Sequence, residues 1–230
     1  MNPTRKSSLV FGLFFFGTFI FSISALFFYE PLFNNSDYLL LGGFDTNISI
    51  GALLEILLAI CNIATAIVIY PIFKQVSGSA SLGYVASRTV ESLLTLSGVV
   101  SLMSIMSLRA DFTTGSNPDD LLLVKQMFMA FHDWTFLLGP QFCSGLGNGL
   151  LLGYIMYRSG AVPKPMAWIG IIGGPLAFIG GVLVLFHVLK PFSLGLFALT
   201  SLEIIWELSI TVYTIFFGFK LIAKLEKRIL

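Results

Sequence analysis

The sequence predicts an all-α polytopic membrane protein, a bundle of six transmembrane helices. Three observations lead to this fold class: 56% of the 230 residues belong to the AVILMFWYC set, only 11% are charged, and the mean hydropathy is +0.91. An ordinary soluble domain is about 45–50% apolar with glycine counted and about 25% charged. A soluble fold could not cover its surface with so few polar groups, and a disordered chain would carry more charge.

Six stretches are long enough to cross a hydrocarbon core, which takes about 20 mostly apolar residues. None alternates with the period of two that a barrel strand requires, so the backbone must satisfy its hydrogen bonds within helices. The connecting loops are too short for a soluble module, and residues 1–230 are expected to form a single transmembrane domain. The spans run approximately over residues 9–28, 48–73, 82–108, 128–157, 165–189 and 192–221.

The first span has two interpretations. Arg5 and Lys6 precede an apolar run that contains a small-residue site at residues 22–24, as a cleaved signal peptide would. The apolar run continues to Phe28, however, which makes it long enough to span the membrane. We therefore expect an uncleaved anchor.

The distribution of lysine and arginine predicts that both termini are cytoplasmic. With the N-terminus inside, nine of the 13 basic residues fall in cytoplasmic segments, whereas Arg109, Lys125 and Lys190 fall in outer loops and Arg88 within the third span. The expected location is a cell membrane, specifically a bacterial inner membrane. A net charge of +1 gives no electrostatic footprint for nucleic acid, so the expected partner is the lipid bilayer.

Glycines recur at intervals of four in the fourth span, at Gly145, Gly149 and Gly153, and in the fifth, at Gly170 and Gly174. Small residues at this spacing let helix backbones approach closely in lipid. Packing between helices of one chain is the main interpretation, and a homodimer through these faces is the alternative.

Prolines interrupt the same two spans. Pro140 and Pro175 each remove a backbone hydrogen bond and are expected to kink their helices. Broken helices sometimes line transport sites, because the freed carbonyl groups can coordinate ions.

Polar and ionisable side chains inside the predicted spans form the candidate site. Such residues cost a few kcal/mol each in lipid and normally face the bundle interior or a water-filled cavity. Helical spacing gives four of the spans a polar stripe each, and the stripes are expected to meet in a pocket that reaches from the outer side to about the midplane. The residues of this buried polar cluster are Glu55, Asn62, Arg88, Glu91, His132, Asp133, Asn148, Glu203 and Glu207.

The charges of this cluster do not balance, because five carboxylates share it with one arginine. Low-dielectric surroundings cannot hold that excess, so carboxyl groups must be protonated, bind a cation or reach water. Arg88 is expected to pair with Glu91 on its own helix or with Glu207 on another. The cluster then binds a proton, a cation or a small ligand, or it is a structural network that only holds the bundle together.

A metal-dependent intramembrane hydrolase is a further alternative, in which His132, His187 and several carboxylates would supply zinc ligands. As a separate possibility, the two histidines could ligate a haem from facing helices. No H-E-x-x-H or similar spacing is present, so we assign no catalytic residue, no metal ligand and no cofactor. Cys61 and Cys143 stand alone in their spans, which predicts neither a disulfide nor redox chemistry.

Four segments carry a resemblance to a known family. They are RTVESLL at residues 88–94, HDWTFLLGPQFCSGLGNGLLLGY at 132–154, LLLGYIMYRSGAVPKPMAWIGIIGG at 150–174 and EIIWELSITVYTIFFGFK at 203–220. The chain resembles, over nearly its whole length, the bacterial membrane proteins grouped as domain of unknown function 4386. The resemblance implies a six-helix integral membrane protein, and it carries over no activity.

Overall fold

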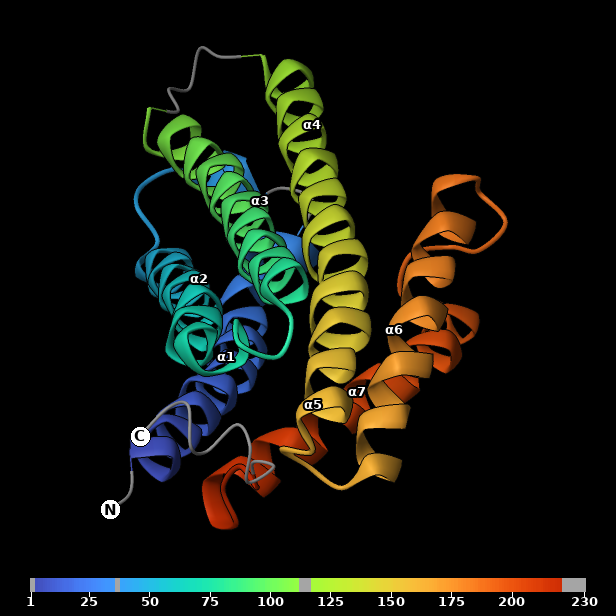
Figure 1. Ribbon diagram of the computed structural model, residues 1–230. Coiled ribbons are helices and arrows are strands. Elements are labelled where there is room, and N and C mark those ends of the chain that lie inside the picture. The colour runs from blue at the N-terminus through green and yellow to red at the C-terminus, as the bar shows by residue number, and fades with distance from the viewer. Residues whose placement is uncertain (1–2, 36–37, 112–116, 221–230) are drawn as a thin grey trace.

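In the computed structural model, residues 3–35, 38–111 and 117–220 are described, and they form helices joined by short turns (Figure 1). Among these residues, five helices are long and apolar enough to cross a membrane: α1, α2, α3, α6 and α7. The elements are α1 (Pro3–Asn34), η1 (Tyr38–Leu41), α2 (Thr46–Phe73), α3 (Gly78–Ala110), α4 (Pro118–Phe136), η2 (Leu137–Cys143), η3 (Gly145–Leu152), α5 (Gly153–Ser159), α6 (Lys164–Leu185) and α7 (Leu194–Phe216).

The fourth helix in chain order, which follows α3, is assembled from four segments. From α4 through η2 and η3 to α5 the backbone stays helical, and we call these four segments together the fourth rod (Figure 1). Its middle part, η2 and η3, is π-helical, with each N–H bonded five residues back instead of four. The all-α class with six helices is thus confirmed, and the chain has the structure of a multi-pass membrane protein.

Several helices begin where the sequence offers a capping side chain. Asp45, Ser77, Asn117 and Ser193 each accept a hydrogen bond from a backbone N–H of the first turn of α2, α3, α4 and α7. At the other end of the fourth rod, Gly160 takes a left-handed conformation with φ 65° and ends α5.

The predicted end of the fifth span differs from the structure. The expected fifth span, residues 165–189, placed His187 within the membrane, but α6 ends at Leu185. His187 and Phe192 adopt positive φ angles of 58° and 56° in the tight turn that leads to α7, and His187 is exposed. The histidine therefore belongs to a loop, and it does not face His132 across the bundle.

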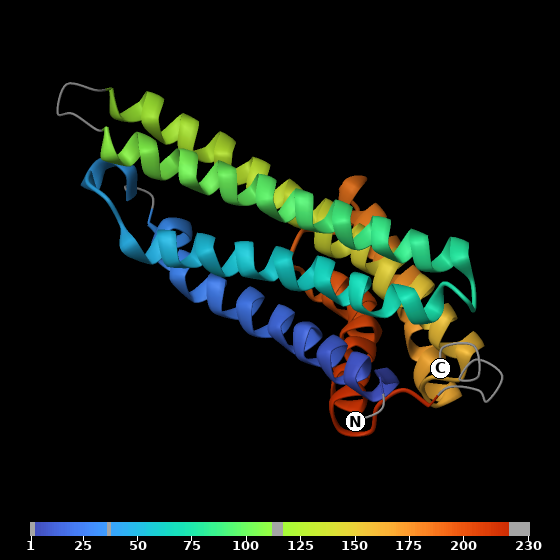
Figure 2. The ribbon, with the colours of Figure 1, turned by 60° about the vertical axis from the view of Figure 1, so that its left-hand side comes forward.

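The helices alternate in direction and close into a ring. Neighbours in sequence pack together from α1 to α7, with η3 against α6, and α7 returns to pack on α1 (Figures 1 and 2). Arg5 secures the closure, because its guanidinium donates to the carbonyls of Thr214, Ile215 and Phe216 at the end of α7. These carbonyls have no partner inside the helix and carry the negative end of its dipole.

Two apolar layers lie near opposite ends of α1, α2 and α3. One contains Phe11, Phe15 and Trp206, and the other contains Tyr29, Leu32 and Leu102. The middle parts of α1, α2 and α3 lie between these layers. The buried polar side chains of Asn62, Arg88 and Glu91 lie at this intermediate level.

Candidate functional site

A cavity of about 300 Å³ lies in the middle of the ring, and we call it the central cavity. Residues from α1, α2, α3, η2, η3, α6 and α7 line it, so the polar stripes predicted on separate helices do face one another. The structure brings six of the nine predicted site residues to its wall: Asn62, Arg88, Glu91, Asn148, Glu203 and Glu207.

Arg88 is fully engaged on one side of this cavity. Its side chain is 2% exposed, and Nη1 lies 2.7 Å from Oε2 of Glu91. Nη2 donates to Oδ1 of Asn62 at 2.5 Å, and Nδ2 of Asn62 donates in turn to Oε1 of Glu91 at 3.3 Å. The three side chains form a closed network from α2 and α3, and the expected local pair of Arg88 and Glu91 is the one present.

Glu207 is held by neutral donors from the fourth rod. Its Oε1 accepts from Oγ of Ser144 at 2.8 Å and from Nδ2 of Asn148 at 2.6 Å. Asn148 also donates to Ser144 Oγ at 3.1 Å. These contacts fix the Glu207 carboxylate against the fourth rod.

Glu203 stands one turn before Glu207 on α7 and has a different environment. The residue is 3% exposed, and neither carboxylate oxygen has a hydrogen-bond partner in the described part of the chain. Oδ1 of Asn148 is unpartnered in the same way. Three acceptor atoms in the wall of one cavity are thus buried without a donor, whereas buried polar atoms are nearly always hydrogen-bonded.

Gln141 in η2, Ser144 between the two π-helical segments and Asn148 in η3 are three of the cavity's polar residues. Neighbouring helices bond directly to their backbone: Ser87 donates to the Cys143 carbonyl at 2.6 Å, and Trp206 donates to the Asn148 carbonyl at 2.7 Å. The expected break at Pro140 is absorbed in η2, where the proline sits within the wider turns. π-Helical insertions of this kind are frequent at functional sites.

Glycines bring the fourth rod and α6 into close contact at this level. A Cβ atom added to Gly149 would overlap both the backbone of Gly174 and the carboxylate of Glu203. Gly145 likewise lies against the backbone of Gly174, and Gly170 lies under the Trp206 ring. The glycine faces predicted for close packing are used within the chain, and the homodimer stays a prediction.

The other three predicted residues form a separate outer group. Tyr29 donates to Oε2 of Glu55 at 3.0 Å, and Nε2 of His132 lies 3.8 Å from Oε1 of the same carboxylate. Nδ1 of His132 lies 3.8 Å from Oδ1 of Asp133, whose side chain is 55% exposed. These side chains belong to the level of the second apolar layer, and none of them lines the central cavity.

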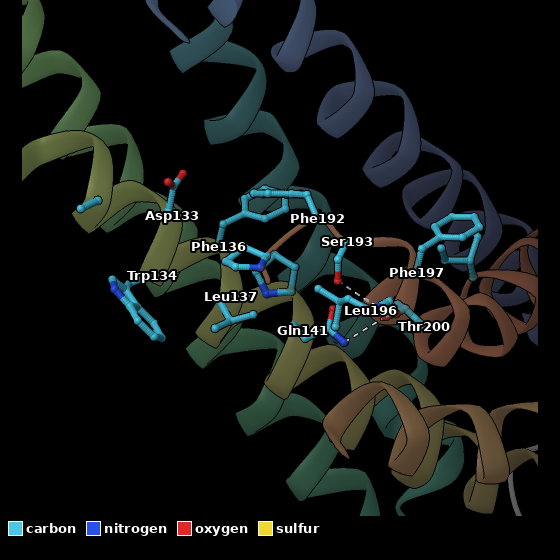
Figure 3. Close-up of a pocket in the computed structure, with 14 residues that line it drawn as sticks. Asp133, Trp134, Phe136, Leu137, Gln141, Phe192, Ser193, Leu196, Phe197 and Thr200 are labelled. Carbon is cyan, nitrogen blue, oxygen red and sulfur yellow. Dashed lines mark hydrogen bonds between the residues drawn. The ribbon is translucent and has the colours of Figure 1, made fainter. Parts of the chain in front are cut away.

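A second cavity of about 420 Å³ lies between the fourth rod and the start of α7, and we call it the outer groove (Figure 3). Most of its wall is apolar, including Trp134, Leu137, Phe192 and Phe197. Hydropathy could not reveal it, because these residues look like any lipid-facing position. It shares five lining residues with the central cavity: Phe136, Pro140, Gln141, Thr200 and Ile204.

Gln141 stands at the junction of the two cavities. Its Nε2 donates to the Ala177 carbonyl at 2.6 Å and to Oγ1 of Thr200 at 3.1 Å, which links η2 to α6 and α7 (Figure 3). The Gln141 amide therefore lies between the apolar outer groove and the acidic central cavity.

Metal-binding geometry is absent from the residues that the structure describes, since no three His, Cys, Asp or Glu side chains gather there. The hydrolase alternative gains no ligand set from them. Cys61 and Cys143 are both free thiols.

Comparison with known proteins gives one match. The sequence profile described as "Domain of unknown function (DUF4386)" covers residues 10–218 of the chain. No curated protein and no solved structure matches it.

Proposed function

The chain belongs to the DUF4386 family, and we propose that it is a multi-pass membrane protein whose central cavity binds a cation on Glu203. One observation carries this proposal: the Glu203 carboxylate is 3% exposed and has no donor to either oxygen among the described residues. A buried carboxylate needs a compensating donor or positive charge, because losing its water costs several kcal/mol.

The neighbouring charges do not supply that compensation. Arg88 is bonded to Glu91 and Asn62, and its charge is balanced by the Glu91 carboxylate 2.7 Å away. Glu207 already receives two neutral donors. Glu203 is thus the acid left over in the cavity, and a cation that enters would complete its coordination.

The alternative is a purely structural role for the buried charges. The closed network of Arg88, Glu91 and Asn62 supports that interpretation for one side of the cavity, since it satisfies its members without a ligand. It does not account for Glu203, whose carboxylate joins no network.

Thermal melting in lipid nanodiscs tests cation binding. Parent protein would be titrated with sodium, potassium or methylammonium chloride, with the ionic strength held constant by N-methylglucamine chloride. A ligand that binds only the folded state adds about 2.7 kcal/mol at a hundred times its Kd, so a bound cation raises the melting temperature with concentration. We expect this rise in the parent and its loss in Glu203→Gln.

The matched control is Glu30→Gln, which removes an exposed carboxylate that accepts a hydrogen bond from Asn34 at the end of α1. It should respond to cations as the parent does. If no cation separates Glu203→Gln from the other two proteins, Glu203 is a protonated structural acid and the proposal fails.

We also propose that the fourth rod crosses the membrane as a sixth span, that both termini are cytoplasmic and that the protein resides in a bacterial inner membrane. The Arg5 contacts with the end of α7 support a common side for the two termini, because they hold the beginning of α1 against the end of α7. In a background with Cys61 and Cys143 replaced by alanine, Phe44→Cys should react with an impermeant maleimide from outside, and Ser79→Cys should react only after lysis. The reverse pattern would overturn the orientation.

A further inference from the structure

We infer that the cation is an amphiphilic ammonium compound, whose charged head enters the central cavity at Glu203 and whose hydrocarbon chain occupies the outer groove. This inference rests on the proposed cation binding and adds the chemical class of the ligand. It depends on how the two cavities are joined and on what each wall offers.

The two cavities have a common wall. Phe136 and Pro140 from the fourth rod and Ile204 from α7 line both, together with the hydrogen-bonded pair of Gln141 and Thr200 (Figure 3). Both side chains can rotate about their single bonds. Their hydrogen bond is therefore the contact that a ligand would displace to reach from one cavity into the other. A molecule that spans this junction would have one end among carboxylates and the other among aromatic and aliphatic side chains.

The inner end suits an ammonium head. Three buried acceptors are unpartnered in the described residues: both oxygens of Glu203 and Oδ1 of Asn148. The Glu203 carboxylate lies against Gly149, the residue that follows Asn148, and Glu203 and Asn148 both line the central cavity. A primary ammonium group has three N–H donors, which matches this number.

A bare metal ion fits the same wall less well. Calcium takes six to eight oxygen ligands and magnesium demands an octahedral set, usually with more than one carboxylate. Glu207 shares the face of Glu203, but its Oε1 is already held by Ser144 and Asn148. The described residues also offer no group of three metal-ligating side chains.

The outer end suits a hydrocarbon chain. Leu137 and Leu196, which are each 9% exposed, line it together with Trp134 and Phe197 (Figure 3). Asp133 lies at the rim with its side chain half exposed, so the carboxylates at both ends of the path favour a cation over an anion. The volumes of about 300 and 420 Å³ fall in the range of small-ligand sites.

Photolabelling in nanodiscs tests the inference. The probe is decylamine with a diazirine in its chain, and the matched neutral probe is decanol with the same diazirine. We expect the amine to label residues 130–141 and 191–204, with at least about tenfold less labelling by the alcohol, because a charged hydrogen bond to Glu203 is worth more than 1.4 kcal/mol. Unlabelled decylammonium should compete with the probe.

Two variants separate the head from the chain. Glu203→Gln should lose the labelling and also the thermal response to methylammonium. Ala130→Trp fills the groove from an exposed position, so it should lose the labelling but keep the methylammonium response. Its control is Ala198→Trp, an exposed alanine on α7 outside the groove, which should keep both.

The outcomes distinguish the two proposals. If methylammonium acts through Glu203 but decylamine labels Ala130→Trp as strongly as the parent, the groove does not hold the chain and this inference is overturned, whereas cation binding stands. Equal labelling by amine and alcohol would show a groove filled by any lipid chain and would overturn it as well. Loss of both responses in the parent would overturn both proposals.

Discussion

Replacing Arg88 by methionine is the sharpest test of the buried network. The change keeps an unbranched apolar stem and removes the guanidinium with its charge, so Glu91 loses its partner at 2.7 Å and Asn62 loses a donor at 2.5 Å. Glu91 would retain only the Asn62 amide at 3.3 Å. Breaking a buried ion pair by removing one partner costs about 3–5 kcal/mol, because the other charge stays buried and uncompensated.

The expected cost can be read as a melting temperature. For a chain of this size, 1 kcal/mol corresponds to about 2–4 °C, so Arg88→Met should melt about 6–20 °C below the parent in detergent. The control is Arg158→Met at an exposed position, expected within about 0.5 kcal/mol of the parent. The double variant Arg88→Met/Glu91→Met should melt above the single one, since it no longer buries a lone carboxylate.

Two results would refute this reasoning. Arg88→Met could have the same melting temperature as Arg158→Met, which would mean that the ion pair contributes nothing to the stability of the fold. Alternatively, the double variant could fall below Arg88→Met by a further several kcal/mol. In that case the cost would come from lost packing of the side chains and not from an unpaired charge.

Gly149→Ala should destabilise the protein by about 1–3 kcal/mol in thermal melts, because its Cβ would overlap backbone and carboxylate atoms. Its control is Gly78→Ala, which has nothing within 4 Å and should be nearly neutral. Equal melting temperatures of the two variants would contradict the close packing at Gly149. Burial and the hydrogen bond to Asp45 raise the pKa of Tyr38 above its ordinary value, so the stability that Tyr38 adds is present below about pH 10 and fades at higher pH. Tyr38→Phe should therefore melt below the parent at pH 8, with the gap narrowing above pH 10, and a constant gap would argue against titration. Arg5→Gln removes the guanidinium from the end of α7 and should lower the free energy of unfolding by about 1–3 kcal/mol in the same melts. A melting temperature equal to that of the parent would mean that the ring closes without these hydrogen bonds.

Hydropathy predicted the number of helices well, because a membrane span needs a long apolar run whatever its neighbours are. It predicted their ends less well. α1 continues to Asn34 and the fourth rod begins at Pro118, beyond the apolar runs, because helical hydrogen bonds and capping residues such as Asn117 act outside lipid too. The turn at His187 shows the opposite error, since an apolar sequence need not be helical to its last residue.

Helical spacing predicted the face of each polar residue but not which residues would meet. Glu55 and Asn62 share a face of α2, yet seven residues separate them by about 10 Å along the axis. Glu55 therefore meets Tyr29 and His132 at the level of the second apolar layer, and Asn62 meets Arg88 in the central cavity. Distances along the axis decided the division of the predicted cluster into two groups.

The π-helical segments lie furthest from what a sequence pattern can show. The glycine and proline at residues 139 and 140 indicate a break, but a kink in an α-helix would satisfy the same pattern. Long π-helical runs are rare, so other parts of the chain must stabilise this one. The Ser87 and Trp206 bonds to its carbonyls, and the contact of Gly149 with Gly174, come from three different helices. Because these contacts also hold Gln141 between the two cavities, the junction exists only in the closed ring, and no single stretch of sequence contains it.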